Sequence, residues 1–190
     1  SKSLRDIALA HIDQIDESDI NLLSRIARAH DAIAKPGNGR IIMAKRGESL
    51  TASGKPMPKI ALTKGQVGRW AYRNSLRQKA GSVVATYQDL AQGKPQECTT
   101  GEGVPVHRIR NRFPKKEEAQ KAADSELLRL KRAGRSFSVD MKGAPDAKAE
   151  AVLQPVGFRS FIDGDWLITQ AVHSLDSRGY RTKIEAEPLK

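Results

Sequence analysis

The sequence predicts a β-rich α+β fold. Short segments alternate apolar with polar residues, Gly, Pro, Asn and Asp cluster between them, and one Ala-rich segment has helical spacing. A chain of 190 residues can form two unequal lobes. We expect a small lobe of helix and hairpin over residues 1–58. Residues 59–190 are expected to form a barrel-like antiparallel β domain that carries one long helix over residues 114–133.

The clearest pattern lies near the C-terminal end and predicts a β-hairpin. Residues 166–175 are rich in β-branched, aromatic and large apolar side chains. Residues 180–186 alternate strictly, with Tyr180, Thr182, Ile184 and Ala186 on one face and Arg181, Lys183 and Glu185 on the other. Asp176 and Gly179 supply turn chemistry between the strands, because Asp can bond its own backbone and Gly can adopt a positive φ. One face of the hairpin should therefore be dry and the other wet.

Two main helices are expected, and residues 3–12 have roughly helical spacing that is compatible with a further short one. Ser18 is a good N-cap for a helix over residues 19–32, and the acids near its start suit the helix dipole. Pro114 suits the first position of the long helix, which ends before Gly134. The long helix has small or apolar residues on one side, and its alanines would let it lie close to a sheet: Ala119, Ala122, Ala123, Leu127 and Leu130.

Further strands are expected at residues 40–45, 67–74, 81–89, 96–99, 104–113, 137–141 and 152–156. Residues 46–59 are mostly Gly, Ser, Thr, Pro and Lys and offer almost nothing apolar to bury. We therefore expect a mobile loop there, with the boundary between the two lobes close to it.

Positive charge is concentrated in two segments. The net charge is +11; residues 35–81 hold eleven Lys or Arg against one acid, and residues 105–135 hold ten against four. Such concentration indicates a polyanionic partner or an acidic protein face. No apolar run reaches the roughly 20 residues that a membrane helix needs, so no membrane segment is expected. The single cysteine, Cys98, excludes an internal disulfide.

The residue spacing predicts no catalytic, metal or cofactor site. The four histidines, at positions 11, 30, 107 and 173, are far apart, and Cys98 has no second cysteine near it. Asp163 and Asp165 could begin a calcium loop, but the following alternate positions hold Leu167 and Thr169, so a tight turn is the better interpretation.

One basic segment interleaves arginines with aromatic residues. Arg69 and Arg73 flank Trp70 and Tyr72 in a pattern that single-strand nucleic-acid surfaces also use. Strand alternation favours the simpler interpretation, in which both rings pack inward and both arginines point outward. Five arginines are the candidate contacts for a polyanion or a protein partner: Arg69, Arg73, Arg108, Arg110 and Arg112.

Several motifs occur in an order that resembles a known family. The C-terminal part reads Gly-Phe-Arg, Asp-Gly-Asp-Trp-Leu-Ile and then Val-x-His-Ser-Leu-Asp-x-x-Gly-Tyr-x-Thr-x-Ile-Glu over residues 157–185. Upstream lie QIDESDINLL at residues 14–23, RGESLTASG at residues 46–54, Gly-Glu-Gly at residues 101–103 and the Ala-rich helix. This order resembles the phage late control gene D family of tail baseplate hub proteins, and it covers most of the chain.

The resemblance implies a structural subunit of a phage or prophage tail with no catalytic residue. Such a hub joins the tail tube to the membrane-piercing spike, forms a trimeric ring, and lies in the virion baseplate after assembly in the bacterial host cytoplasm. Family members carry another β-barrel before this region and the chain begins at Ser1 without methionine, so we expect a piece of a longer protein.

Two other function classes stay open at this point. The basic segments are compatible with a DNA-binding regulator of late phage genes, although no helix-turn-helix pair or zinc finger can be drawn; any nucleic-acid binding is expected to be weak and nonspecific. A tail-associated cell-wall hydrolase would need an acidic pair in a cleft, and no such pair stands out.

Overall fold

The structure, a computed structural model, describes residues 2–9, 12–37, 39–51, 54–75, 80–90 and 92–189. The chain divides into two compact units, each built from two segments. Unit 1 comprises Ser1–Arg46 and Gln78–Lys131, and unit 2 comprises Gly47–Arg77 and Arg132–Lys190. This division differs from a single boundary near residue 58, because strands that precede residue 77 pair with strands that follow residue 132.

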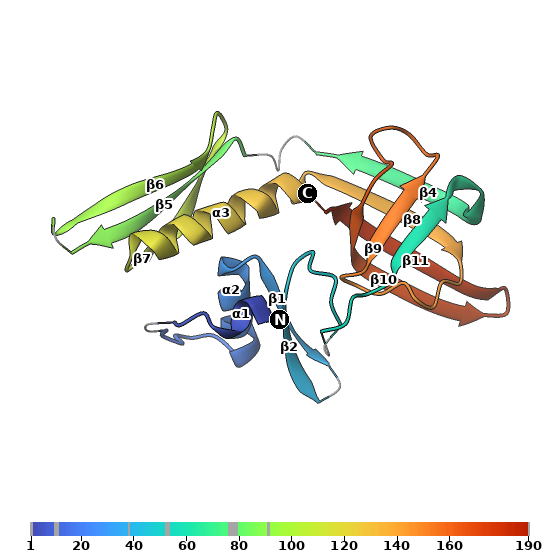
Figure 1. Cartoon of the computed structure of the whole chain (residues 1–190), viewed down its shortest axis with the longest axis horizontal. Coiled ribbons are helices and arrows are strands. Elements are labelled where there is room, and N and C mark those ends of the chain that lie inside the picture. The colour runs from blue at the N-terminus through green and yellow to red at the C-terminus, as the bar shows by residue number, and fades with distance from the viewer. Residues whose placement is uncertain are drawn as a thin grey trace. The chain divides into compact units, whose positions relative to one another are not determined.

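Unit 1 contains a small hairpin, a three-stranded sheet and helices (Figure 1). Its elements are α1 (Lys2–Arg5), α2 (Asp19–Ala29), β1 (Ala32–Gly37), β2 (Arg40–Lys45), β5 (Ser82–Asp89), β6 (Lys94–Gly101), β7 (Val106–Phe113) and most of α3 (Lys116–Ala133). The sheet order is β6-β5-β7, in which β6 is antiparallel and β7 parallel to β5.

The predicted helix over residues 19–32 is shorter than expected. It ends at Ala29, and Asp31 has a φ of +49° that interrupts the helix. The residues from Ala32 onward instead form β1, which pairs antiparallel with β2. Ser18 has the extended backbone of an N-cap but makes no side-chain capping bond. The expected helix-and-hairpin composition of this region is present, with one more strand than the sequence indicated.

The long helix α3 packs on the three-stranded sheet through its alanines. Ala119 and Ala123 are fully buried, and with Leu127 they contact Val83, Ala85 and Cys98 of β5 and β6. Small side chains at this contact let the helix lie close to the sheet, as the sequence predicted. Burial raises the pKa of the Cys98 thiol, which suits a structural rather than a reactive cysteine.

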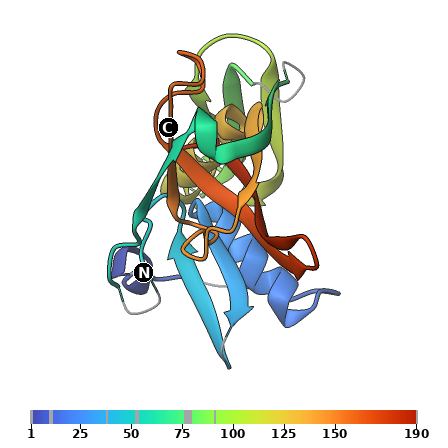
Figure 2. The same ribbon diagram turned by 90° about the vertical axis from the view of Figure 1, so that its right-hand side faces the viewer.

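Unit 2 is a single six-stranded sheet that curls on itself (Figures 1 and 2). Its strands are β3 (Lys59–Thr63), β4 (Val67–Asn74), β8 (Arg135–Lys142), β9 (Val152–Val156), β10 (Trp166–Asp176) and β11 (Gly179–Pro188), with the short helix η1 (Lys64–Gln66) joining β3 to β4. The order is β3-β9-β10-β11-β8-β4. The β-rich α+β class with a barrel-like sheet and one long helix is confirmed, although β3 pairs parallel with β9 rather than antiparallel.

Ring contacts across the sheet measure its curvature. Tyr72 on β4 and Trp166 on β10 are three strands apart in the sheet order, which would separate them by about 14 Å if the sheet were flat. Their ring centroids are 6.2 Å apart. On the same side, Trp70 contacts Phe137 on the neighbouring strand β8 and Phe158 in the segment between β9 and β10, at ring-centroid distances of 6.4 and 5.7 Å. The sheet therefore folds around an aromatic core, and both rings of β4 point inward as the alternation predicted.

The predicted C-terminal hairpin is confirmed as β10 and β11. The pairing runs from Trp166 opposite Pro188 to Asp176 opposite Gly179, which leaves a tight connection. Asp176 accepts the main-chain N–H of Arg178 at 2.8 Å, and Gly179 has a φ of +103°. Thr182, Ile184 and Ala186 are buried while Arg181, Lys183 and Glu185 are exposed, as expected. Tyr180, which was also expected on the dry face, is instead exposed near the tip of the hairpin.

The segment between residues 46 and 59 contains some regular structure. Leu50 forms a bridge with Pro56, and the N–H of Met57 donates to the carbonyl of Ser49 at 2.7 Å. Residues 52 and 53 lie outside the described residues, so the mobility of the segment stays a prediction. None of the described helices is both long and apolar enough to cross a membrane.

Phe137 is fully buried at the centre of the aromatic core, whereas Phe161 is half exposed at its margin. We expect Phe137→Ala to lower the free energy of unfolding by about 3–5 kcal/mol, because it removes a buried ring and leaves a cavity. Phe161→Ala is the matched control and should lower it by roughly half as much, following its smaller buried area. The free energies of unfolding of the two variants are measured by urea unfolding, followed by the fluorescence of the two tryptophans, both of which lie in unit 2. Equal losses in the Phe137 and Phe161 variants would contradict this description of the core.

Candidate functional site

The chemically reactive side chains do not gather in one place. His30 lies at the C-terminal end of α2, His107 lies 3.3 Å from Glu126, and His173 lies on β10. His11 is outside the described residues. Within the described part of the chain, no group of three or more His, Cys, Asp or Glu side chains could hold a metal ion.

The two aspartates of the candidate calcium loop serve the turn instead. Asp163 accepts the main-chain N–H of Phe158 at 3.0 Å. Asp165 accepts the side-chain amide of Gln154 at 2.6 Å and the ammonium of Lys59 at 3.2 Å. These bonds hold the pKa of Asp165 below its usual range, with the Gln154 bond as the largest cause. Both carboxylates are thus used to fix the connection between β9 and β10.

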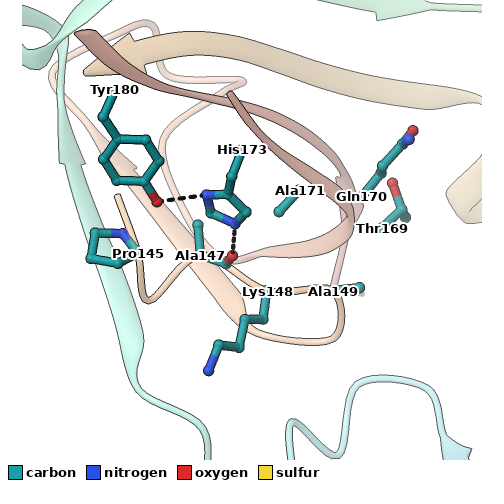
Figure 3. Close-up of a pocket in the computed structure, with 9 residues that line it drawn as sticks. All are labelled: Pro145, Ala147, Lys148, Ala149, Thr169, Gln170, Ala171, His173 and Tyr180. Carbon is teal, nitrogen blue, oxygen red and sulfur yellow. Dashed lines mark hydrogen bonds between the residues drawn. The ribbon is translucent and has the colours of Figure 1, made fainter. Parts of the chain in front are cut away.

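A surface pocket of about 490 Å³ lies in unit 2 beside the β10–β11 hairpin (Figure 3). It is lined by residues of the loop before β9 and by one face of the hairpin: Pro145, Ala147, Lys148, Ala149, Thr169, Gln170, Ala171, His173 and Tyr180. Four of these residues are small and apolar, and the other five carry polar groups. Among the polar residues, His173 and Tyr180 lie against each other (Figure 3).

His173 ties the hairpin to the preceding loop. Its Nε2 lies 2.9 Å from the carbonyl oxygen of Ala147, which can only accept, so Nε2 carries the hydrogen and donates. In the neutral ring Nδ1 is then the acceptor for the hydroxyl of Tyr180 at 2.8 Å and for that of Thr182 at 3.2 Å. Thr182 in turn accepts the main-chain N–H of Ala144 at 2.9 Å. The imidazole is fully engaged by structural partners.

Gly143 lets the loop approach the hairpin closely. Its N–H donates to the carbonyl of Tyr180 at 3.0 Å, and a Cβ added to Gly143 would lie 1.8 Å from a ring carbon of Tyr180. Even an alanine would therefore displace the tyrosine ring or the loop. We name the set Gly143, Ala147, His173, Tyr180 and Thr182 the hairpin clamp.

Sequence reasoning did not find the hairpin clamp as a unit, although its signal was present. Strict alternation and the short connection fix the register, and that register puts His173 opposite Thr182 and Leu175 opposite Tyr180, all on one face. The contribution of Gly143 and Ala147 could not be found in this way, because a loop brings them to the hairpin.

The five candidate arginines fall into two groups on different units. Arg69 and Arg73 are exposed on β4 of unit 2, where Arg69 pairs in register with Asp140 of β8. Their neighbours Trp70 and Tyr72 are partly buried and pack against the aromatic core, an arrangement that disfavours base stacking.

The second group lies on β7 of unit 1. Arg108, Arg110 and Arg112 are all exposed. Arg108 forms an ion pair of 2.6 Å with Glu97 on β6. On the other face of β7, Ile109 and Phe113 pack against the core beneath α3. The strand therefore turns Ile109 and Phe113 to the core and leaves the three arginines exposed.

Comparison with known proteins gives the family. A profile of the family described as "Phage tail baseplate hub (GPD)" matches residues 2–179. The chain belongs to the phage tail baseplate hub family. The resemblance drawn from the motif order is thereby confirmed, and the match includes both units and the hairpin clamp except Tyr180 and Thr182, which lie just beyond its end.

Curated relatives agree with this assignment. The chain is 27% identical to the probable baseplate hub protein of Escherichia phage 186 and 26% identical to that of Escherichia phage P2, in each case over 97% of its own length. It spans 59% of the length of each of these relatives.

Solved structures share the fold at low identity. The 43 kDa tail protein of prophage MuSo2 from Shewanella oneidensis has a TM-score of 0.69 and 18% identity, covering 92% of this chain and 56% of that one. The tail protein from Neisseria meningitidis MC58 has a TM-score of 0.71 and 14% identity, covering 95% and 58%. The hub-family fold is therefore found in tail proteins of distant sequence.

The close approach at Gly143 generates a stability prediction. Gly143→Ala should lower the free energy of unfolding by about 1–3 kcal/mol through overpacking against Tyr180. Gly65→Ala is the matched control, because a Cβ there meets open space at an ordinary φ. The double variant Gly143→Ala/Tyr180→Ala should lose less free energy of unfolding than the two single variants lose together. Urea unfolding of all three variants measures this. Strict additivity would mean that the two residues do not touch.

Glu126 on α3 generates a pH prediction for unit 1. Its hydrogen bond with Arg129, together with the charges of Arg129 and His107, lowers the pKa of Glu126 below its usual range. A carboxylate with a depressed folded-state pKa adds stability above its unfolded pKa of about 4.3, and this stability is lost as the pH falls through the folded-state value. Glu126→Gln should therefore flatten the fall in stability below about pH 5. Thermal melts by circular dichroism test this, with exposed Glu117→Gln as the control; identical acid slopes for Glu126→Gln and the natural chain would contradict it.

Proposed function

We propose that the chain is part of a structural subunit of a phage or prophage tail baseplate hub, joining the tail tube to the membrane-piercing spike. The observation that carries the proposal is the hub-family match over residues 2–179. The shared fold with two tail proteins, at TM-scores of 0.69 and 0.71, supports it. The site of action would be the virion baseplate, after assembly in the cytoplasm of the bacterial host.

The role that we propose is mechanical and needs no catalytic residue. The most reactive side chain in the pocket, His173, is bonded to Ala147, Tyr180 and Thr182. Asp163 is likewise bonded within its own turn, and Asp165 is bonded to Gln154 on β9 and Lys59 on β3. These bonds stabilise loops and strand connections, which suits a structural role.

We further propose that the complete hub subunit is a homotrimer. Contacts around a threefold axis are heterologous, so each subunit must offer two different surfaces to its neighbours. The two units of this chain present different exposed faces: a basic strand on unit 1 and a mixed polar sheet face on unit 2. Nucleic acid would bind at most weakly and without sequence preference.

Two observations weigh against a DNA-binding regulator. Trp70 and Tyr72, the rings of the basic aromatic segment, are partly buried against the core of unit 2, which disfavours stacking on bases. In the described residues, α1 and α2 are separated by thirteen residues and α2 and α3 by several strands, which is unlike the short turn of a helix-turn-helix. Neither observation favours a transcriptional regulator over the hub.

Affinity purification tests the proposed hub role. The full-length protein, tagged and expressed in its own host together with the other tail genes, should recover tail tube and spike proteins, and native mass spectrometry should find three copies for each spike assembly. The same tagged protein expressed without the other tail genes is the control for adventitious capture. Recovery of DNA in place of tail proteins, or a protein that remains monomeric in the presence of spike, would refute the proposal.

A further inference from the structure

Strand β7 leaves one edge of the unit 1 sheet unpaired. In the order β6-β5-β7 it pairs with β5 on one side, and no other strand within the described ranges pairs with it on the other. An exposed strand edge presents main-chain N–H and C=O groups that can accept a further strand. β7 is eight residues long, which is ample for such pairing.

Strand β7 carries several positive charges. Arg108, Arg110 and Arg112 occupy alternate positions in the sequence and are exposed. Their spacing is not that of a regular strand, because Arg108 and Arg112 pair with Val84 and Thr86, which are only two positions apart on β5. Arg108 already binds a carboxylate, that of Glu97, at 2.6 Å. Arg110 and Arg112 form no ion pair with any other described residue. Arg110 and Arg112 are thus available to bind carboxylates of a partner, and the Arg108–Glu97 pair is an example of such binding on the same strand.

The same charges disfavour a second copy of β7 as the added strand. Antiparallel pairing of the strand with itself about Arg110 would place Arg108 opposite Arg112, and like charges directly opposite each other destabilise a sheet. The other face of β7 is used internally, since Ile109 and Phe113 pack toward α3. Tyr87 and Phe113, the aromatic residues of unit 1, both belong to that core, so no ring is offered to nucleic-acid bases.

We propose that β7 binds an acidic, extended segment of a protein partner as an added strand, with carboxylates at alternate positions facing Arg108, Arg110 and Arg112. Main-chain bonds at the edge would supply the pairing, and the arginines would set register and specificity. β5 and β7 shift register between Val84 and Thr86, near Arg110. The added strand should therefore pair most regularly beside Val106–Arg108 and at the Arg112 end. This inference rests on the geometry and charge of β7 and does not require the hub role.

Two synthetic peptides of the same composition test the proposal. The peptide TEVEVETE alternates its glutamates, whereas EEEEVVTT carries them in one block, so the two have equal charge and differ in pattern. Binding to the full chain is measured by fluorescence anisotropy at about 150 mM salt, where long-range attraction is screened. The alternating peptide should bind at least tenfold more tightly than the block peptide, and hydrogen exchange should show added protection within residues 106–113.

Variants assign the binding to β7. The double variant Arg110→Ser/Arg112→Ser should bind the alternating peptide at least tenfold more weakly than the natural chain does. Circular dichroism should confirm that the variant is folded. Arg69→Ser/Arg73→Ser, which removes two exposed strand arginines from unit 2, is the matched control and should bind as the natural chain does. The proposal would be overturned if the chain bound both peptides with equal affinity or bound neither. It would also be overturned if the unit 1 and unit 2 double variants lost equal affinity for the alternating peptide. Tighter binding of the single strand dT12 than of the alternating peptide at the same salt would also overturn it and indicate a nucleic-acid surface.

Discussion

Burial of the aromatic core holds the six-stranded sheet of unit 2 in its curled form. Tyr72 lies on β4 and Trp166 on β10, and two other strands separate β4 from β10 in the sheet. Their rings can touch only if the sheet curls, because a flat sheet would keep these two strands too far apart. Phe137, on β8 between these two strands in the order, is fully buried, and its ring centroid is 5.5 Å from that of Trp166. Because the curl brings the inner faces of the strands together, it leaves polar residues such as Arg69 and Asp140 on the outside.

The C-terminal motif from which the family resemblance was drawn has a structural explanation in the hairpin clamp. His173, Tyr180 and Thr182 belong to that motif, and together they bind the loop that precedes β9. Gly101 in the upstream Gly-Glu-Gly motif is also structural, since it has a φ of +83° and a Cβ there would lie 2.5 Å from the carbonyl of Gly81. Residues that hold turns and loops in place suit a family whose members serve as tail components.

The local sequence pattern predicted most of the helices and strands. It could not predict the features that depend on pairing between residues far apart in the sequence. Alternation identified the hairpin of β10 and β11 and the inward rings of β4, and Ala spacing identified the sheet-facing side of α3. The helix that ends at Ala29 was predicted to continue because nothing local marks Asp31 as a break; β1 exists because β2 is available to pair with it. The division into units, the parallel β3–β9 pair and the role of Gly143 all depend on residues distant in sequence.

The central claim is that this chain is a component of the tail baseplate. It is tested most directly by locating the protein in particles. A peptide tag inserted at the tip of the β10–β11 hairpin, between Ser177 and Arg178, lies at an exposed position away from the buried core. Gold labelling of purified tails by electron microscopy should place the tag at the baseplate end of the tail. Label along the tail, on the capsid, or absent from assembled particles that contain every other tail protein would contradict the account.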